Sequence, residues 1–168
     1  RECHGDLHLG NLVLIADEPV AFDALEFDEH LRWIDVASDV AFVHMDLLHH
    51  GLPDLAARFL NAWCEASSDF AGLRVLSFYL VYRAMVRAKV AAIRQSQAVT
   101  EEAKDKARGD VRAYVELAGR LAMTPAPAVI AMHGLSGSGK TTVSLALVDA
   151  MLTRCLARDP AHGPAHAF

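Results

Sequence analysis

The order of hydrophobic and polar positions near the start of the chain predicts a short hairpin followed by a helix. Residues 12–15 and 19–23 are rich in side chains that favour strands, and the two acids at 17–18 predict the turn between them. The apolar spacing changes to a helical pattern over 34–50, and Gly51 is a typical residue for the end of that helix.

Three further helices are predicted downstream by the same periodicity and by the residues at their ends. Pro53 can occupy the first turn of a helix that ends near Ala66. A long amphipathic pattern covers 73–97. Thr100 and the two glutamates after it predict the start of a last helix that runs to about Ala122, because a capping hydroxyl and acids stabilise a helix N-terminus.

The helix over 73–97 has two sides of different chemistry. The side that we expect to be buried carries Phe78, Val81, Tyr82, Met85, Val86 and Ile93. Three arginines, Arg83, Arg87 and Arg94, fall together on the other side. We interpret them as a solvated face, and the alternative is a contact with phosphate or an acidic substrate.

Two prolines within the stretch MTPAPA interrupt the helical pattern and predict a linker at 123–127. The sequence therefore predicts a first domain over 1–122, the beginning of a second over 128–156, and a disordered tail over 157–168. The expected fold class is α+β and rich in helix.

Composition narrows the range of functions only slightly. The formal net charge of −5 argues against a nucleic-acid surface, which would need a basic stripe. Cys3, Cys64 and Cys155 are too far apart for a zinc site or a disulfide framework, which favours a reducing, cytoplasmic location. No stretch is apolar enough to suggest a membrane partner. The nine histidines include no HExxH or i,i+4 pair at 44–50, and a metal site built from them is not expected.

A polar motif near the N-terminus has the spacing HxDxxxxN, formed by His4, Asp6 and Asn11. In phosphoryl transfer an aspartate accepts the proton of the acceptor hydroxyl, and an asparagine five residues later binds magnesium. A second carboxylate must reach the metal, and Asp23 at the end of the predicted hairpin is suitably placed.

The stretches HGDLHLGN, VAFD and DVASDVAF together resemble the C-terminal lobe of aminoglycoside-phosphotransferase-like kinases, over roughly residues 1–122. The resemblance implies a protein-kinase-like fold, ATP and Mg²⁺ as cofactors, and a small-molecule hydroxyl as acceptor. It implies that Asp6 is the catalytic base and that Asn11 and Asp23 are the metal ligands.

The same resemblance assigns supporting roles. His4 would pack beneath the loop, and Asp35 and Asp39 match the structural acids of the family, with Asp39 expected to cap or pin the loop. The metal-binding aspartate is followed by Ala-Leu-Glu rather than by the family's aromatic-glycine ending, and Glu26 is either a surface acid, which we favour, or a further ligand. The family's N-terminal lobe would have to precede Arg1, so the chain is expected to be a fragment.

A second motif, GLSGSGKT, fits the phosphate-binding pattern GxxxxGK[ST] between a predicted strand at 128–132 and a helix at 142–156. Glycines let backbone N–H groups converge on a phosphate at the N-terminus of a helix. The expected nucleotide contacts are Gly134, Ser136, Gly137, Ser138, Gly139, Lys140, Thr141 and Thr142, with Thr141 also a magnesium ligand.

The tandem order of the two motifs resembles bacterial two-part proteins that join a phosphotransferase-like domain to a P-loop domain of the small-kinase or AAA-type ATPase kind. Three hypotheses remain open at this point. Either the first part is an ATP-dependent phosphotransferase and the P-loop is a second nucleotide site, or the first part is a non-catalytic binding module and only the P-loop handles nucleotide. The third hypothesis is that the chain as given is a truncated product without activity, because each site lacks half of its walls.

Overall fold

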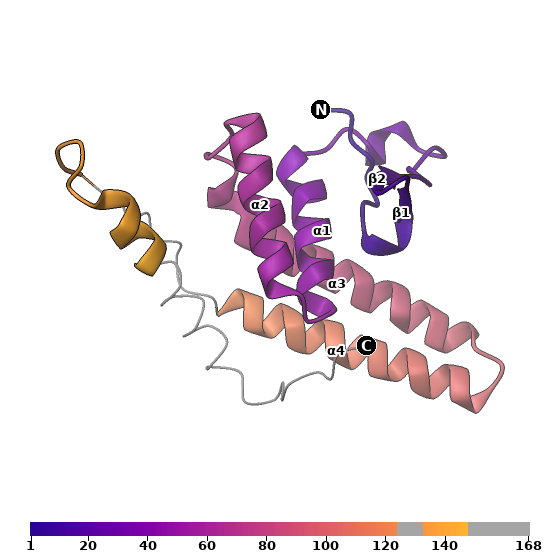
Figure 1. Cartoon of the computed structure of the whole chain (residues 1–168). Coiled ribbons are helices and arrows are strands. Elements are labelled where there is room, and N and C mark those ends of the chain that lie inside the picture. The colour runs from indigo at the N-terminus through magenta and orange to yellow at the C-terminus, as the bar shows by residue number, and fades with distance from the viewer. Residues whose placement is uncertain (124–132, 148–168) are drawn as a thin grey trace. The chain divides into compact units, whose positions relative to one another are not determined.

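The computed structural model describes residues 1–123 and 133–147 of the 168-residue chain (Figure 1). The chain divides into two compact units, Arg1–Pro125 and Ala126–Phe168. The division lies within the range 123–127 that the sequence predicts as a linker.

The first unit opens with a two-stranded antiparallel hairpin, β1 (Leu12–Ile15) and β2 (Glu18–Ala21), which follows the short 3-10 helix η1 (Leu9–Asn11). Ala16 and Asp17 form the turn, with φ of 51° and 65°. Two successive residues with positive φ are typical of the two-residue turns whose twist matches a hairpin. The predicted turn at 17–18 is therefore wrong by one residue, because Glu18 pairs with Ile15 as the first residue of β2.

Four helices make up the rest of the unit: α1 (Val36–His49), α2 (Pro53–Ser67), α3 (Leu73–Gln97) and α4 (Glu101–Ala122), with a second 3-10 turn, η2 (Glu29–Leu31), before them. The Asp35 carboxylate caps α1 by accepting from the backbone N–H of Ala37 at 3.0 Å. Thr100 caps α4 in the same way at the N–H of Ala103. The predicted helices are confirmed, with ends that differ by at most two residues.

The core lies where α1 meets the other helices. α3 and α4 run side by side as a long hairpin, and α1 packs against α3 (Figure 1). Phe42 and Met45 of α1 are completely buried, and they join α3 and α4 residues in the main apolar cluster. α1 is therefore the central helix of the unit.

The face of α3 that is buried differs from the predicted one. The buried residues of this helix are Leu76, Leu80, Arg83, Ala84, Ala88 and Ala91. Phe78 and Tyr82, expected in the core, have relative exposures of 67% and 49%, and Met85 and Ile93 are also exposed. The prediction placed the larger apolar side chains in the core, whereas the buried face consists mainly of alanines and leucines, and the small alanines allow the close approach of α3 to its neighbours.

In the second unit, the described residues 133–147 form a loop followed by a helix from 140 onwards (Figure 1). The predicted strand at 128–132, the helix beyond 147 and the tail at 157–168 lie outside the described residues. The helix-rich α+β class is confirmed for the part of the chain that is described. None of the helices in that part has the length and apolarity that a bilayer span requires.

Candidate functional site

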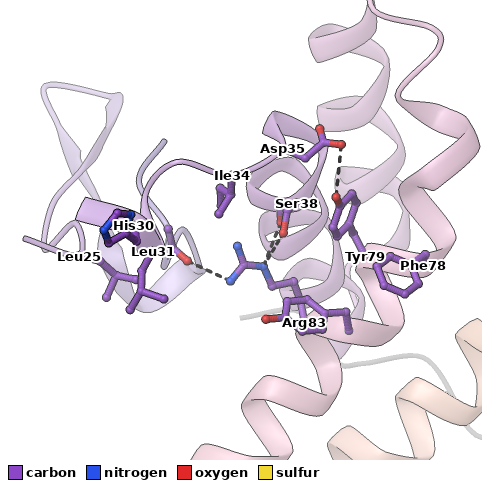
Figure 2. A pocket seen from close by; sticks show the side chains of 11 residues that line it. Leu25, His30, Leu31, Ile34, Asp35, Ser38, Phe78, Tyr79 and Arg83 are labelled. Atoms are coloured by element: carbon purple, nitrogen blue, oxygen red, sulfur yellow. Dashed lines mark hydrogen bonds between the residues drawn. The ribbon is translucent and has the colours of Figure 1, made fainter. Parts of the chain in front are cut away.

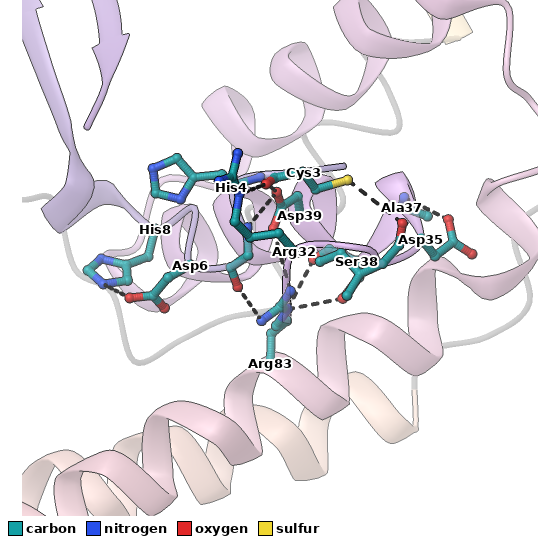
Figure 3. Close-up of polar contacts among 12 residues, drawn as sticks. Cys3, His4, Asp6, His8, Arg32, Asp35, Ala37, Ser38, Asp39 and Arg83 are labelled. Atoms are coloured by element: carbon teal, nitrogen blue, oxygen red, sulfur yellow. Dashed lines mark hydrogen bonds and ion pairs between the residues drawn. The ribbon is translucent and has the colours of Figure 1, made fainter. Parts of the chain in front are cut away.

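Residues 4–11, which carry the HxDxxxxN motif, lie across α1 and are fixed to it at both ends. The Asp39 carboxylate accepts from the backbone N–H groups of His4 at 2.7 Å and Gly5 at 3.1 Å (Figure 3). The Asp46 carboxylate accepts from the N–H of Leu9 at 2.9 Å. Residues seven apart lie two turns along one helix face, so α1 presents two acceptors to the ends of one loop.

Asp39 behaves as the sequence predicts, whereas the role of Asp46 was missed. Asp46 is buried, with a relative exposure of 2%. Its signal in the sequence is a second acid seven residues after Asp39 in a helix that is mostly apolar.

Arg83 of α3 neutralises the first of these aspartates. Its guanidinium lies 3.5 Å from Asp39 Oδ1, and the two side chains have relative exposures of 8% and 7%. It also donates to the Gly5 carbonyl at 3.0 Å and to the Ser38 carbonyl and hydroxyl at 3.2 and 3.1 Å (Figure 3). Burial lowers the pKa of Arg83, and the charge of Asp39 opposes that shift. The interpretation of this arginine as part of a solvated face is therefore wrong.

Asp6 and Asn11, predicted as catalytic base and metal ligand, are brought together. The Asn11 amide nitrogen donates to the Asp6 carbonyl at 3.0 Å and to its carboxylate at 3.4 Å. Because Nδ2 is committed to these contacts, Oδ1 is the atom through which Asn11 can bind a cation. Asn11 is itself buried, which fixes its orientation.

The environment of the Asp6 carboxylate favours its ionised form. His8 Nε2 lies 3.5 Å from Asp6 Oδ2. The hydrogen bond with His8 lowers the pKa of Asp6 against the opposing effect of burial, and the charges of His8, Arg87 and Arg83 lower it further. A general base near neutral pH must be ionised, and Asp6 meets that condition.

The backbone before Asp23 is tethered to the same loop. The His4 ring pairs with the Phe22 carbonyl at 2.8 Å, and the Phe22 N–H donates to the Asn11 carbonyl at 3.0 Å. Asp23 adopts a φ of 59° and is exposed. Aspartate adopts this left-handed conformation more readily than most residues.

Asn11 and Asp23 provide too few ligands to hold magnesium by themselves and fit it only together with phosphate oxygens. Within the described residues no three His, Cys, Asp or Glu side chains form a metal-binding group. Mg²⁺ is usually held by one or two carboxylates together with substrate phosphates and water. The Asn11 amide oxygen and the Asp23 carboxylate are hard oxygen donors of that kind, and Glu26 is exposed.

Asp35, predicted as a structural acid, has two structural contacts. One carboxylate oxygen caps α1, and the other accepts from the Tyr79 hydroxyl at 3.3 Å (Figure 2). Asp35 therefore links the start of α1 to α3 and is not placed to do chemistry.

A pocket of about 400 Å³ borders the loop at Gly5 (Figure 2). Arg83 and Ser38 line it together with the aromatic side chains Phe78, Tyr79 and Tyr82 of α3. The remaining lining residues are Leu25, His30, Leu31, Ile34 and Asp35. Its volume lies near the lower end of the range for small-molecule sites.

The glycine-rich segment of the second unit curls around the side chain of Lys140. Lys140 Nζ donates to the carbonyls of Gly134, at 2.8 Å, and Leu135, and it lies 3.4 Å from the Ser138 hydroxyl. Gly137 and Gly139 both have a φ of 78°, a region that favours glycine. The Gly139 carbonyl accepts from Val143, so the loop leads directly into the helix.

All the predicted nucleotide contacts thus lie on this loop or in the first turn of the helix after it. Ser136 is at the exposed tip, and Thr141 and Thr142 are exposed in the first helical turn. Glycine-rich loops at the N-terminus of a helix are common phosphate-binding places in proteins.

Comparison with known proteins reveals relatives but no activity. An uncharacterised protein of Mycobacterium bovis and two of Mycobacterium tuberculosis are each 35% identical over 159 residues. The match covers 93% of this chain, so it extends into both units, but this chain spans only 30% of the length of those relatives. No protein-family model and no solved structure matches the chain.

Proposed function

We propose that the first unit belongs to an ATP-dependent phosphotransferase that acts on a hydroxyl group of a small molecule. The observation that supports this most is the paired arrangement of Asp6 and Asn11 in a loop that α1 fixes at both ends. In the reaction, the acceptor oxygen forms a bond to the γ-phosphorus while the bond to the β,γ-bridging oxygen breaks. The hydroxyl proton passes to Asp6 Oδ and ADP leaves.

Asn11 and Asp23 would hold Mg²⁺, which supplies positive charge to the phosphate oxygens when it is bound. The residues of this chain do the remainder. Asp6 orients and deprotonates the hydroxyl, and His8 keeps its carboxylate ionised. The pocket that begins at Gly5, one residue from Asp6, offers an apolar surface for the body of the acceptor.

The second unit would bind a separate nucleotide on the loop at 134–141. When a phosphate enters, Lys140 would exchange its two loop carbonyls for phosphate oxygens, and Thr141 would reach the magnesium ion. This proposal rests on the loop geometry alone and does not depend on catalysis by the first unit.

The test uses the longest protein that the gene encodes and measures Mg²⁺-dependent ADP formation in the presence of a library of hydroxylated small molecules. Asp6→Asn should lower acceptor-dependent turnover by about 10²–10⁴-fold, the usual contribution of a general base. Asp17→Asn is the matched control, since Asp17 lies in the hairpin turn and should leave turnover unchanged. Equal rates for the Asp6 variant and the control would contradict the proposal.

The second candidate function is that the first unit only binds a ligand and that the P-loop alone handles nucleotide. The Asp23 carboxylate favours this second function, because it is exposed and makes no hydrogen bond or ion pair with any described residue. On this hypothesis Lys140→Ala abolishes all nucleotide turnover and Asp6→Asn changes none of it. The phosphotransferase hypothesis predicts that acceptor-dependent turnover survives Lys140→Ala.

A further inference from the structure

Arg87 differs from the other shielded arginines in the part of the chain that is described. Three arginines there are buried or half-buried, namely Arg32, Arg83 and Arg87. Arg32 pairs with Glu2 at 2.7 Å, and Arg83 pairs with Asp39. Arg87 has no carboxylate within ion-pair distance among those residues. A half-buried guanidinium with no carboxylate within ion-pair distance keeps its charge available for an anionic ligand.

The side chain of Arg87 is nevertheless held in place. Its Nε donates to the Tyr114 hydroxyl at 3.3 Å, and its guanidinium carbon lies 5.6 Å from the centre of the Tyr114 ring. That ring is buried and stacks on His49 at 4.0 Å with an interplanar angle of 15°. Only Nε is used, so within the described residues the two terminal nitrogens make no hydrogen bond.

Arg87 lies one turn after Arg83 on α3, which contacts the loop that carries Asp6. Residues four apart share one helix face, and Arg83, one turn earlier, donates to the Gly5 carbonyl. His49, on which the Tyr114 ring stacks, follows Asp46 by one turn of α1. Arg87 thus shares the α3 face of Arg83, which contacts the loop that Asp39 and Asp46 hold at its two ends. Its charge also acts on the Asp6 carboxylate.

We propose that Arg87 is an anion-binding residue of the phosphotransfer site, whose two terminal nitrogens bind an oxyanion beside Asp6. A planar pair of N–H groups on an always-charged group matches two oxygens of a phosphate or carboxylate. The oxyanion comes either from the nucleotide's phosphates or from an anionic group on the acceptor. In the second case the acceptor is a hydroxyl-bearing phosphate or carboxylic acid. The inference rests on the proposed function and adds the class of ligand.

Anion binding to the first unit can be measured without turnover in the full 168-residue chain. Trp33 and Trp63 are the two tryptophans and both lie in the first unit, so their fluorescence reports on its unfolding alone. All variants carry Lys140→Ala, which removes the phosphate contact expected of the P-loop. Inorganic phosphate, MgATP and glycerol 3-phosphate are titrated separately, and each dissociation constant follows from the rise in unfolding temperature.

Arg87→Met should weaken phosphate binding about tenfold or more, as expected for loss of a charge-assisted pair. Arg87→Lys should restore part of the affinity, and Tyr114→Phe should weaken binding because Nε loses its anchor. The matched control is Arg94→Met, an exposed position on the same helix, which should bind as the parent does. If Arg87→Met weakens the binding of MgATP, the oxyanion belongs to the nucleotide. If it weakens the binding of glycerol 3-phosphate, the oxyanion belongs to the acceptor.

Two outcomes overturn the inference: no stabilisation of the parent by any of the three anions, or stabilisation that Arg87→Met leaves intact. These results are distinguishable from failure of the proposed function. Loss of turnover in Asp6→Asn with unchanged anion binding in Arg87→Met retains the phosphotransferase and rejects the role of Arg87.

Discussion

Replacing Arg83 with methionine tests whether the buried ion pair supports the loop that carries Asp6. The substitution keeps an unbranched apolar side chain over Phe42, whose ring centre lies 4.7 Å from the guanidinium carbon. It removes the donors to Gly5 and Ser38, and it leaves the Asp39 carboxylate buried with a relative side-chain exposure of 7%. The two loop N–H groups that remain on Asp39 satisfy it only partly.

The expected loss of stability follows from that uncompensated charge. Removing one partner of a buried ion pair costs about 3–5 kcal/mol. For a unit of this size the loss corresponds to a fall in unfolding temperature of roughly 10–20 °C. Arg94→Met, in the same helix but exposed, should change stability by less than about 0.5 kcal/mol.

Urea unfolding followed by tryptophan fluorescence provides the measurement, since both tryptophans lie in the first unit. A double-mutant cycle with Asp39→Asn isolates the pair, and an interaction energy between about 0.5 and 3 kcal/mol is expected for groups in direct contact. The reasoning is refuted if Arg83→Met and Arg94→Met unfold at the same urea concentration, because the pair would then contribute no net stability.

Three further perturbations test other parts of the first unit by the same unfolding assay. Gly5→Ala should destabilise the unit by about 1–3 kcal/mol, because Gly5 has a φ of 84° and an added Cβ would lie 3.0 Å from the Leu31 carbonyl oxygen. Gly109→Ala is the control, since it lies in an open helical position and should stabilise the unit slightly. Equal effects of the two substitutions would contradict this reasoning. Asp46→Ala should cost about 1–3 kcal/mol by leaving the Leu9 N–H without its acceptor, and Asp46→Asn, which keeps an acceptor oxygen, should cost less. Burial lowers the pKa of His44 in the folded state, so the unfolded chain binds the proton more readily. The free energy of unfolding should therefore be highest above the unfolded-state pKa of about 6.5 and should fall as the pH drops below it. A His44→Gln variant with an unchanged pH dependence of stability would reject this.

The sequence was informative about the ends of the helices because these depend on local chemistry. α3 begins and ends at the predicted residues 73 and 97, and Thr100 caps α4 as expected. Capping hydroxyls, prolines and glycines act within one turn of chain, so their effect can be judged without knowing the neighbours.

The buried face of α3 could not be predicted in the same way, since it depends on which helices pack on it. Arg83 looked like a surface residue because long charged side chains are almost always exposed unless they are paired. Its partner, Asp39, lies 44 residues earlier in the chain, and no local pattern connects the two. The same holds for Asp46 and Leu9, which are 37 residues apart.

The two candidate loops differ in how far their conformation depends on a ligand. The loop at 4–11 takes its shape from side chains of α1 and α3. The loop at 134–139 is closed on Lys140, which must leave the Gly134 and Leu135 carbonyls before it can bind a phosphate. A loop that the fold already holds in one conformation loses less conformational entropy when a ligand binds. On the proposed function, the first loop would therefore bind its ligand without rearrangement, whereas the second would exchange hydrogen bonds. Substitutions that loosen α1 or α3 should therefore weaken function in the first unit even when no residue that touches the substrate has changed.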